Sequence, residues 1–324
     1  MSQGRSGRLL AWAKWTGLGL VACLLVFVFG FVPYWLVGAF TTSKFQMRDK
    51  ENEGLTPATF QLAFEDVSFS AKDGPALKGW WVPAQDAKGT VVLVHGLNRS
   101  RLEMVKKTPF LHEQGWNALL FDLRAHGDSG GSLRTLGFYE RGDVLAAVEL
   151  ARSRAPGVPV ALWGISFGGA TAVFAAADDA KVAALVCDSS FRSLRDTTAH
   201  HLGLFRQFRW WARLVPTWPV KDEVLFWFER RTGVDPDLLD VQKAAAQLRG
   251  RPTLFVANSG DRRMPQEIAF DLQKAAGERA AVLVIPGTSH GGAWREGTAP
   301  YEAAVKKVLE EARAGTGPER LAAR

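Results

Sequence analysis

One serine stands where its surroundings favour reactivity. Gly164-Ile165-Ser166-Phe167-Gly168-Gly169 follows the apolar run Val160–Trp163 and opens the Ala-rich stretch Ala170–Ala177. A G-x-S-x-G motif between a strand and a helix holds its serine on a sharp turn, which requires small neighbours. The hydroxyl then lies at a helix N-terminus, where developing negative charge is stabilised. The pattern predicts that Ser166 is a nucleophile for acyl transfer.

A serine nucleophile needs a histidine base that is oriented by a carboxylate. When the serine lies on such a strand–turn–helix motif, the usual order of the three residues along the chain is serine, acid, histidine. Of six histidines, only His290 comes after the later predicted strands, on a Gly-flanked loop that follows Ala281–Ile285. Asp261 follows Thr253–Val256 and is the preferred acid, because the carboxyl ends of parallel strands share one rim. Asp188 also follows a strand and is the alternative acid.

The oxyanion of such a reaction needs two backbone N–H donors. We expect one from Phe167, directly after the serine. The other is expected from Leu97, in the loop His95-Gly96-Leu97-Asn98 after Thr90–Val94. We interpret His95 as a scaffold of this loop. His126 precedes the serine in the chain and is interpreted as structural.

Other chemistries lack their motifs. The sequence contains no Cys/His cluster, His200-His201 lacks the spacing of a helical metal pair, and neither a G-x-G-x-x-G motif after a strand nor a phosphate-binding loop is present. We therefore expect no metal and no cofactor. The net charge is +7, but no long Lys/Arg run or zinc-finger spacing accompanies it, so nucleic acid is not an expected partner.

The elements that must position these residues alternate between strand and helix patterns. Two half-buried strands are followed by short apolar runs typical of strands covered on both faces. The expected strands are Phe64–Ser70, Ala76–Val82, Thr90–Val94, Ala118–Phe121, Val160–Trp163, Val182–Val186, Thr253–Val256 and Ala281–Ile285. Helix-period stretches such as Phe138–Arg152 and Pro265–Ala276 lie between them. The alternation predicts an α/β fold with a mostly parallel central sheet and helices on both faces.

One connection is too long for a simple crossover. We expect a helical lid insertion at about residues 191–247, and His201–Phe228 within it is rich in Trp, Phe and Arg. These aromatic residues either line an apolar pocket or touch a bilayer, or they simply pack the lid on the sheet. The interleaved arginines either bind an anionic headgroup or face water.

The N-terminal segment has no charged residue from Trp15 to Phe40. About 20 apolar residues cross a bilayer core, so residues 15–40 predict an uncleaved transmembrane signal anchor. A cleaved signal peptide ending at Val37-Gly38-Ala39 is the main alternative, although its apolar region would be unusually long. A buried core helix is a second alternative. We expect a bacterial inner-membrane location with the catalytic domain on the periplasmic side.

The remaining boundaries follow from composition. We expect a short basic tail at residues 1–14, a linker at 41–63, the main domain at 64–313 and a disordered tail at 314–324. Cys23 and Cys187 lie in separate contexts, so no disulfide framework is implied.

Several motifs together resemble those of α/β-hydrolases. They are His95-Gly96, the loop from Asp122 to Ser129, the motif around Ser166, Gly260-Asp261 and Ser289-His290. The chain looks most similar to the N-terminally anchored, BEM46-like branch of serine hydrolases. The resemblance covers about residues 64–311 and implies the triad Ser166, Asp261 and His290, with Leu97 and Phe167 as oxyanion donors.

The expected function is that of a membrane-anchored serine hydrolase acting on a small-molecule or lipid acyl ester or thioester. An amide or peptide hydrolase would use the same triad. A non-catalytic, membrane-anchored binding protein of the same fold is a third hypothesis.

Overall fold

The computed structural model describes residues 3–42, 47, 49–209, 212–213 and 216–315. An eight-stranded sheet with the order β1-β2-β4-β3-β5-β6-β7-β8 forms the centre of the domain that follows the N-terminal helix. β1 and β2 are antiparallel to their neighbours, and the pairs from β4 to β8 are parallel. The strands are β1 (Glu65–Ser70), β2 (Ala76–Val82), β3 (Thr90–Val94), β4 (Asn117–Phe121), β5 (Val160–Ile165), β6 (Ala184–Asp188), β7 (Thr253–Asn258) and β8 (Ala280–Ile285). The predicted mostly parallel sheet is confirmed.

One strand prediction is displaced. The run Val182–Val186 was expected as a strand, but β6 begins at Ala184. The N–H of Val182 bonds to the carbonyl of Asp179 in a turn, so Val182 cannot join the sheet ladder. At its other end β6 extends two residues past the predicted end, to Asp188.

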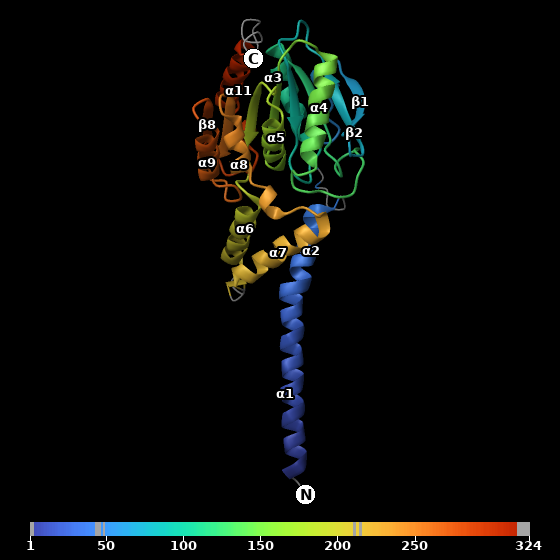
Figure 1. Ribbon diagram of the computed structural model, residues 1–324, viewed down its shortest axis with the longest axis vertical. Coiled ribbons are helices and arrows are strands. Elements are labelled where there is room, and N and C mark those ends of the chain that lie inside the picture. Colours follow the sequence, from blue (N-terminus) through green and yellow to red (C-terminus); the bar gives the residue numbers. More distant parts are fainter. Residues whose placement is uncertain (1–2, 43–46, 48, 210–211, 214–215, 316–324) are drawn as a thin grey trace.

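Helices cover both faces of the sheet and bury its apolar side chains (Figure 1). One face carries α4 (Glu140–Arg154), α5 (Phe167–Asp178), α8 (Val241–Ala245) and α9 (Glu267–Ala276), and the other carries α3 (Thr108–Glu113), α10 (Ala293–Glu296) and α11 (Thr298–Ala314). The core strands β3, β4 and β5 are fully buried, as their continuous apolar runs require.

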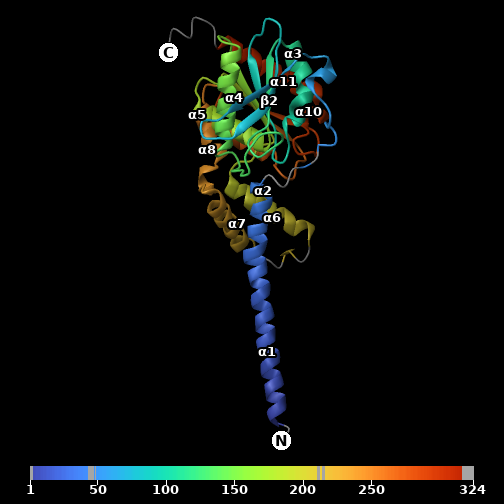
Figure 2. The same cartoon turned by 90° about the vertical axis from the view of Figure 1, so that its right-hand side faces the viewer.

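The predicted insertion is helical and lies between β6 and β7. It contains α6 (Leu194–Phe208), α7 (Thr217–Thr232), two short 3-10 turns (Pro236–Leu238 and Ala246–Leu248) and α8. Figures 1 and 2 both show α6 and α7 on the side of the domain from which the N-terminal helix leaves. We call α6 and α7 together the lid.

The N-terminal segment is one long helical rod. It consists of α1 (Gln3–Val26), a π-helical turn (η1, Phe27–Phe31) and α2 (Val32–Thr41). From Arg8 to Thr41 it is long and apolar enough to cross a membrane by length and composition, and only 11% of its most apolar stretch is buried. This feature fits a membrane anchor and a signal sequence alike.

The upper end of the rod packs on the protein. α2 lies against α7, and its buried residues are Pro33, Val37 and Thr41. The expected linker at 41–63 contains the 3-10 turn Pro57–Phe60, while residues 43–46 and 48 lie outside the described residues. Of the expected tail, Ala314 ends α11, and residues 316–324 lie outside the described part.

Candidate active site

Ser166 lies on the strained turn between β5 and α5. Its φ of 55° and ψ of −119° are unfavourable for a residue with a side chain. Two glycines permit the turn, because a Cβ on Gly164 would lie 2.3 Å from the carbonyl oxygen of Gly168, and one on Gly168 would lie 2.3 Å from that of His95. The serine N–H is held by the carbonyl of Asp188 at 2.7 Å. The backbone therefore presents the hydroxyl at the carboxyl rim of the sheet.

The structure brings Ser166, His290 and Asp261 together. His290 Nε2 lies 2.7 Å from Ser166 Oγ, and His290 Nδ1 lies 2.7 Å from Asp261 Oδ2. Because the Asp261 carboxylate accepts a hydrogen bond from Nδ1–H of His290, the proton of the neutral ring is on Nδ1. Nε2 is therefore unprotonated and can accept the serine proton. The three side chains come from the ends of β5, β7 and β8, so the parallel sheet brings together residues that lie up to 124 positions apart.

Hydrogen bonds from His290 and from two backbone amides lower the pKa of Asp261. Its Oδ1 accepts from the N–H groups of Arg263 and Met264 at 2.8 and 3.1 Å. Burial acts to raise the pKa of Asp261, but the hydrogen bond and charge of His290 and these two amides outweigh it and hold the pKa below its ordinary value. An ionised Asp261 suits the role of orienting an imidazole.

Asp188, the alternative acid, is engaged elsewhere. Its buried carboxylate accepts from the hydroxyls of Tyr301 at 2.9 Å and Ser189 at 2.7 Å. Ser189 Oγ in turn accepts from the N–H of Gly291, next to His290, at 3.3 Å. Asp188 thus supports both the nucleophile turn and the histidine loop without bonding the imidazole.

The two expected oxyanion donors lie on either side of the nucleophile turn. Phe167 begins α5, and Leu97 follows β3, which is adjacent to β5. Within the part of the chain that the structure describes, neither N–H donates to a protein acceptor.

His95 supports the Leu97 loop. Its Nε2 accepts from the N–H of Leu123 at 3.1 Å, so its Nδ1 carries the proton and donates to the carbonyl of Gly96 at 2.8 Å. Burial lowers the pKa of His95, which favours this neutral form. The ring ties the loop after β3 to the loop after β4.

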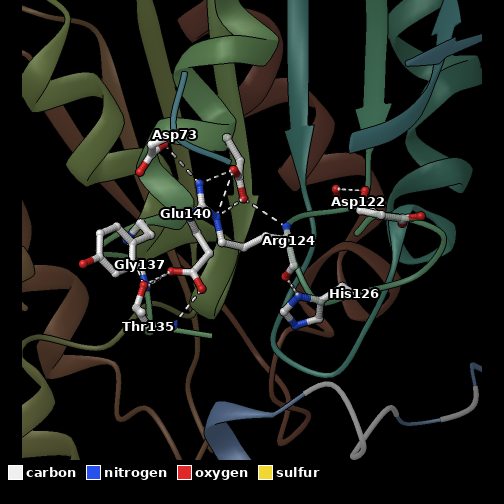
Figure 3. A network of polar contacts seen from close by, with 10 residues as sticks. Asp73, Asp122, Arg124, His126, Thr135, Gly137 and Glu140 are labelled. Atoms are coloured by element: carbon white, nitrogen blue, oxygen red, sulfur yellow. Dashed lines mark hydrogen bonds and ion pairs between the residues drawn. The ribbon is translucent and has the colours of Figure 1, made fainter. Parts of the chain in front are cut away.

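The loop after β4 is held by a buried polar network (Figure 3). The Arg124 guanidinium pairs with Asp143 at 2.7 Å, and Glu140 accepts from the N–H groups of Thr135 and Gly137. His126 donates through Nδ1 to the carbonyl of Arg124 at 2.8 Å and stacks on Phe167. Burial lowers the pKa of His126 well below its ordinary value, so the ring is neutral. It contacts the nucleophile helix and does not bond Ser166.

The last turn of the N-terminal helix is connected with the loop that carries Leu97. The carbonyl of Thr41 accepts from the N–H of Arg134 at 2.9 Å, and Thr42 forms an antiparallel bridge with Leu133. The buried Arg134 guanidinium donates to Asn98 Oδ1 at 2.5 Å. Asn98 directly follows Leu97, so this chain of contacts connects α2 with an expected oxyanion donor.

Two residues near these three side chains were not among the expected site residues. Glu296 accepts hydrogen bonds from Ser289 and Asn258, which belong to the histidine and acid loops respectively. His201 of α6 lies within electrostatic reach of His290 and Asp261, and its Nε2 is buried without a hydrogen-bond partner among the residues that the structure describes. Their sequence neighbourhoods contain no motif, because their roles arise from the packing of α10 and the lid.

A cavity of about 360 Å³ lies beside the site rather than at it. Its wall includes Trp80, Asn98, Arg101 and Asp122 and none of the three triad side chains. Arg101 is stacked on Trp80 and paired with Asp122 at 2.7 Å. We assign no catalytic role to this cavity.

Comparisons with known proteins agree with this geometry. Residues 85–232 match a family model described as "Serine aminopeptidase, S33". The chain is 24% identical to the uncharacterized protein YqkD of Bacillus subtilis over 241 residues, which are 73% of this chain and 76% of that protein. It is 31% identical over 178 residues to the uncharacterized protein YfhR of Escherichia coli O157:H7, covering 52% of this chain and 60% of that protein.

The esterase Pf2001 of Pyrococcus furiosus is similar in structure. It superimposes with a TM-score of 0.65 at 22% identity, over 79% of this chain and 94% of the esterase. The sheet order, the turn at Ser166 and this superposition together establish that the chain has the α/β-hydrolase fold.

Proposed function

We propose that this protein is a serine hydrolase that cleaves an acyl ester or thioester through the triad Ser166, His290 and Asp261. The observation that carries the proposal is the pair of 2.7 Å contacts that join the imidazole to the serine hydroxyl and to the carboxylate. A strained serine with a base and an oriented carboxylate is a costly arrangement that acyl transfer requires.

The mechanism follows from the geometry. Ser166 Oγ attacks the substrate carbonyl while His290 Nε2 takes its proton, and Asp261 stabilises the imidazolium that forms. The N–H groups of Leu97 and Phe167 receive the charge that develops on the carbonyl oxygen. His290 then protonates the leaving alcohol or thiol, and water cleaves the acyl-enzyme by the same steps in reverse. No cofactor takes part in these steps.

The test is labelling of the full-length protein with a fluorophosphonate, which reacts only with an activated serine. Ser166→Ala is expected to abolish labelling, and Asp261→Asn to slow it by about a thousandfold or more because the imidazole loses its orientation. Ser132→Ala removes an exposed serine outside the site and is expected to label normally. If the folded wild-type protein does not label, a non-catalytic binding protein of this fold becomes the better interpretation.

An amide or peptide hydrolase is the second candidate, favoured by the description of the matching family as a serine aminopeptidase. The same triad serves both reactions, so the discriminating experiment compares esters and amides of equal shape. We expect the ester to have the higher kcat/KM. A preference for the amide would favour the second candidate.

We further propose that the N-terminal helix is retained as a single-pass membrane anchor, as in the BEM46-like branch, with the catalytic domain on the periplasmic side of a bacterial inner membrane. The packing supports retention over cleavage. Val37 is only 3% exposed and Thr41 is fully buried, so cleavage after Ala39 would remove a side chain from the core and separate Thr41 from its helix. Immunoblotting of membrane fractions is expected to detect the uncleaved length, and a shortened, soluble product would contradict retention.

A further inference from the structure

The N-terminal helix is longer than a membrane requires. Arg8–Thr41 comprises 34 residues, which is roughly 50 Å of helix, whereas about 20 residues cross a ~30 Å hydrocarbon core. The excess lies at the upper end, since α2 is the part that packs on the protein. Counted from Arg8, about 20 residues end at Phe27, and counted from the charge-free boundary at Trp15 they end at Tyr34. For the proposed membrane anchor, this count places the membrane border on the domain side between Phe27 and Tyr34.

This stretch of the helix is the part that contacts the lid. α7 packs against both η1 and α2, and the ring of Tyr34 meets that of Trp227 edge to face at 5.2 Å. The two views agree that α6 and α7 lie beside the upper part of the rod (Figures 1 and 2). The lid is consequently level with the membrane border.

The lid exposes large apolar side chains at this level. Trp218 is 70% exposed and Phe208 is 66% exposed, and Phe205 and Phe226 are also exposed. Elsewhere in the described part of the catalytic domain, exposed large apolar side chains occur singly, as at Tyr139, Leu238 and Phe270. A group of exposed aromatic residues is typical of a surface that enters a membrane interface.

The lid also carries excess positive charge. Residues 194–232 contain seven Lys/Arg against four Asp/Glu. Arg209 and Arg213 are exposed and lie between Phe208 and Trp218 in the chain, whereas the exposed Arg230 and Arg231 lie at the opposite end of α7. Basic side chains beside exposed aromatic rings suit an anionic phospholipid surface.

The same helix connects this surface with the triad. His201 of α6 lies close enough to His290 and Asp261 for electrostatic interaction, and Phe208 is seven residues further along. Seven residues correspond to about 10 Å of helix. The catalytic rim is therefore a short distance from the level of the lipid headgroups.

We propose that the ends of α6 and α7 around Phe208 and Trp218 dock into the anionic headgroup layer of the adjoining leaflet, and that the enzyme takes its acyl substrate from that leaflet. The substrate class is then an ester of a membrane-resident amphiphile. The docking rests on the proposed membrane anchor, and the second half of this proposal rests on the proposed hydrolase function as well.

Docking is tested by measuring depth in the full-length protein. The protein is reconstituted in vesicles of phosphatidylethanolamine and phosphatidylglycerol, and a nitroxide is attached to single cysteines introduced by Phe208→Cys or Trp218→Cys. Cys23→Ser and Cys187→Ala provide the background, and native Cys23 alone, exposed on the anchor, marks the membrane interior. Phe270→Cys is the control, since Phe270 is 49% exposed on α9, outside the lid.

The depth of each nitroxide is obtained from two collision rates, one with oxygen, which concentrates in the bilayer, and one with a water-soluble nickel chelate. Labels at positions 208 and 218 are expected to lie between those of Cys23 and position 270 and to move outward when phosphatidylglycerol is replaced by phosphatidylcholine. Chelate access equal to that at position 270 would overturn the proposal. Protection that persists in detergent with spin–spin broadening would also overturn it, because a second copy of the chain would then cover the lid.

Substrate origin is tested with a variant in which Phe205, Phe208, Trp218 and Phe226 are all replaced by Ser. Hydrolysis of a long-chain ester embedded in vesicles is expected to fall by about tenfold or more, because the apolar contact with the leaflet is lost. Hydrolysis of a water-soluble short-chain ester is expected to stay unchanged. Equal rates on the embedded ester would overturn leaflet capture, whereas absence of activity on both esters in the wild type would refute the hydrolase function and leave the depth result standing.

Discussion

The hydroxyl of Tyr301 donates a 2.9 Å hydrogen bond to the buried carboxylate of Asp188, which ends β6 next to the turn at Ser166. Trp163 Nε1 lies 3.1 Å from the same hydroxyl, and Ser189 bonds the other carboxylate oxygen. Burial raises the pKa of Asp188, while these donors and the Lys107 charge oppose the rise. The pair joins α11 to the turn that carries the proposed nucleophile.

Tyr301→Phe is expected to destabilise the protein by about 1–3 kcal/mol, because it leaves a buried carboxylate with one donor fewer. The labelling rate is expected to fall less than in Asp261→Asn, since the triad contacts remain. Thermal unfolding and labelling kinetics measure the two effects. Tyr139→Phe, at an exposed tyrosine, is the control, and equal unfolding temperatures for the two variants would contradict a structural role for the Asp188–Tyr301 pair.

Glu296 is expected to position the triad. Glu296→Gln changes an acceptor shared by Ser289 and Asn258, so the histidine and acid loops shift relative to each other. We expect kcat to fall by about 10- to 100-fold with little change in KM, because small misplacements of catalytic groups slow the reaction without weakening substrate binding. Steady-state kinetics on a soluble ester measure this. Glu310→Gln, exposed on α11, is expected to behave as wild type, and a change confined to KM would argue against positioning.

The close contact of Gly168 with β3 is expected to make it intolerant of any side chain. Gly168→Ala would place a Cβ 2.3 Å from the His95 carbonyl oxygen, which forces the backbone apart at a cost of about 1–3 kcal/mol or more. Gly203→Ala, in the middle of α6 with open space around it, is expected to stabilise by about 0.5–1 kcal/mol. Chemical denaturation compares the two. Similar changes in the free energy of unfolding for both variants would mean that the turn at Ser166 relaxes more easily than its geometry indicates.

His201 is expected to make the protein sensitive to acid. Burial, together with the charges of Arg263, His200 and His290, lowers the pKa of His201 to about 4, while Asp261 opposes this. In the unfolded chain this histidine has its ordinary pKa near 6.5. Between pH 6.5 and about 4 the unfolded chain therefore binds more protons at His201 than the folded protein does, and stability is lost as the pH falls through this range.

The matched variant is His201→Gln, which cannot titrate. Between about pH 7 and about pH 4.5 the wild type is expected to lose about 2 kcal/mol more stability than the variant. The buried His95 and His126 contribute in the same direction but are present in both proteins, so the difference isolates His201. Parallel stability curves for the two proteins would show that His201 is not buried in solution.

Much of the fold could be predicted because its signals are local. The strands Ala76–Val82 and Thr90–Val94 have the predicted bounds, since each is a short apolar run between turn residues. The contact of Ser166 with His290 follows from strand-end placement and chain order, which the sequence contains.

The remaining features depend on long-range packing. Tyr301 meets Asp188 across 113 positions, and Tyr34 meets Trp227 across an even longer separation, with no motif marking either pair. Glu296 lies in a four-residue helix whose sequence resembles many exposed segments. Such contacts arise only when the elements are assembled, so residue type and spacing do not predict them.

The contact between Thr41 and Arg134 moves the boundary of the folded domain. Hydropathy ends the apolar N-terminal segment near Phe40 and would leave a domain that is separable at that point. The hydrogen bond from the N–H of Arg134 to Thr41, and that from the Arg134 guanidinium to Asn98 beside Leu97, join the last turn of the N-terminal helix to the domain that carries Ser166. A fragment shortened at the hydropathy boundary therefore lacks one support of the loop that carries Leu97.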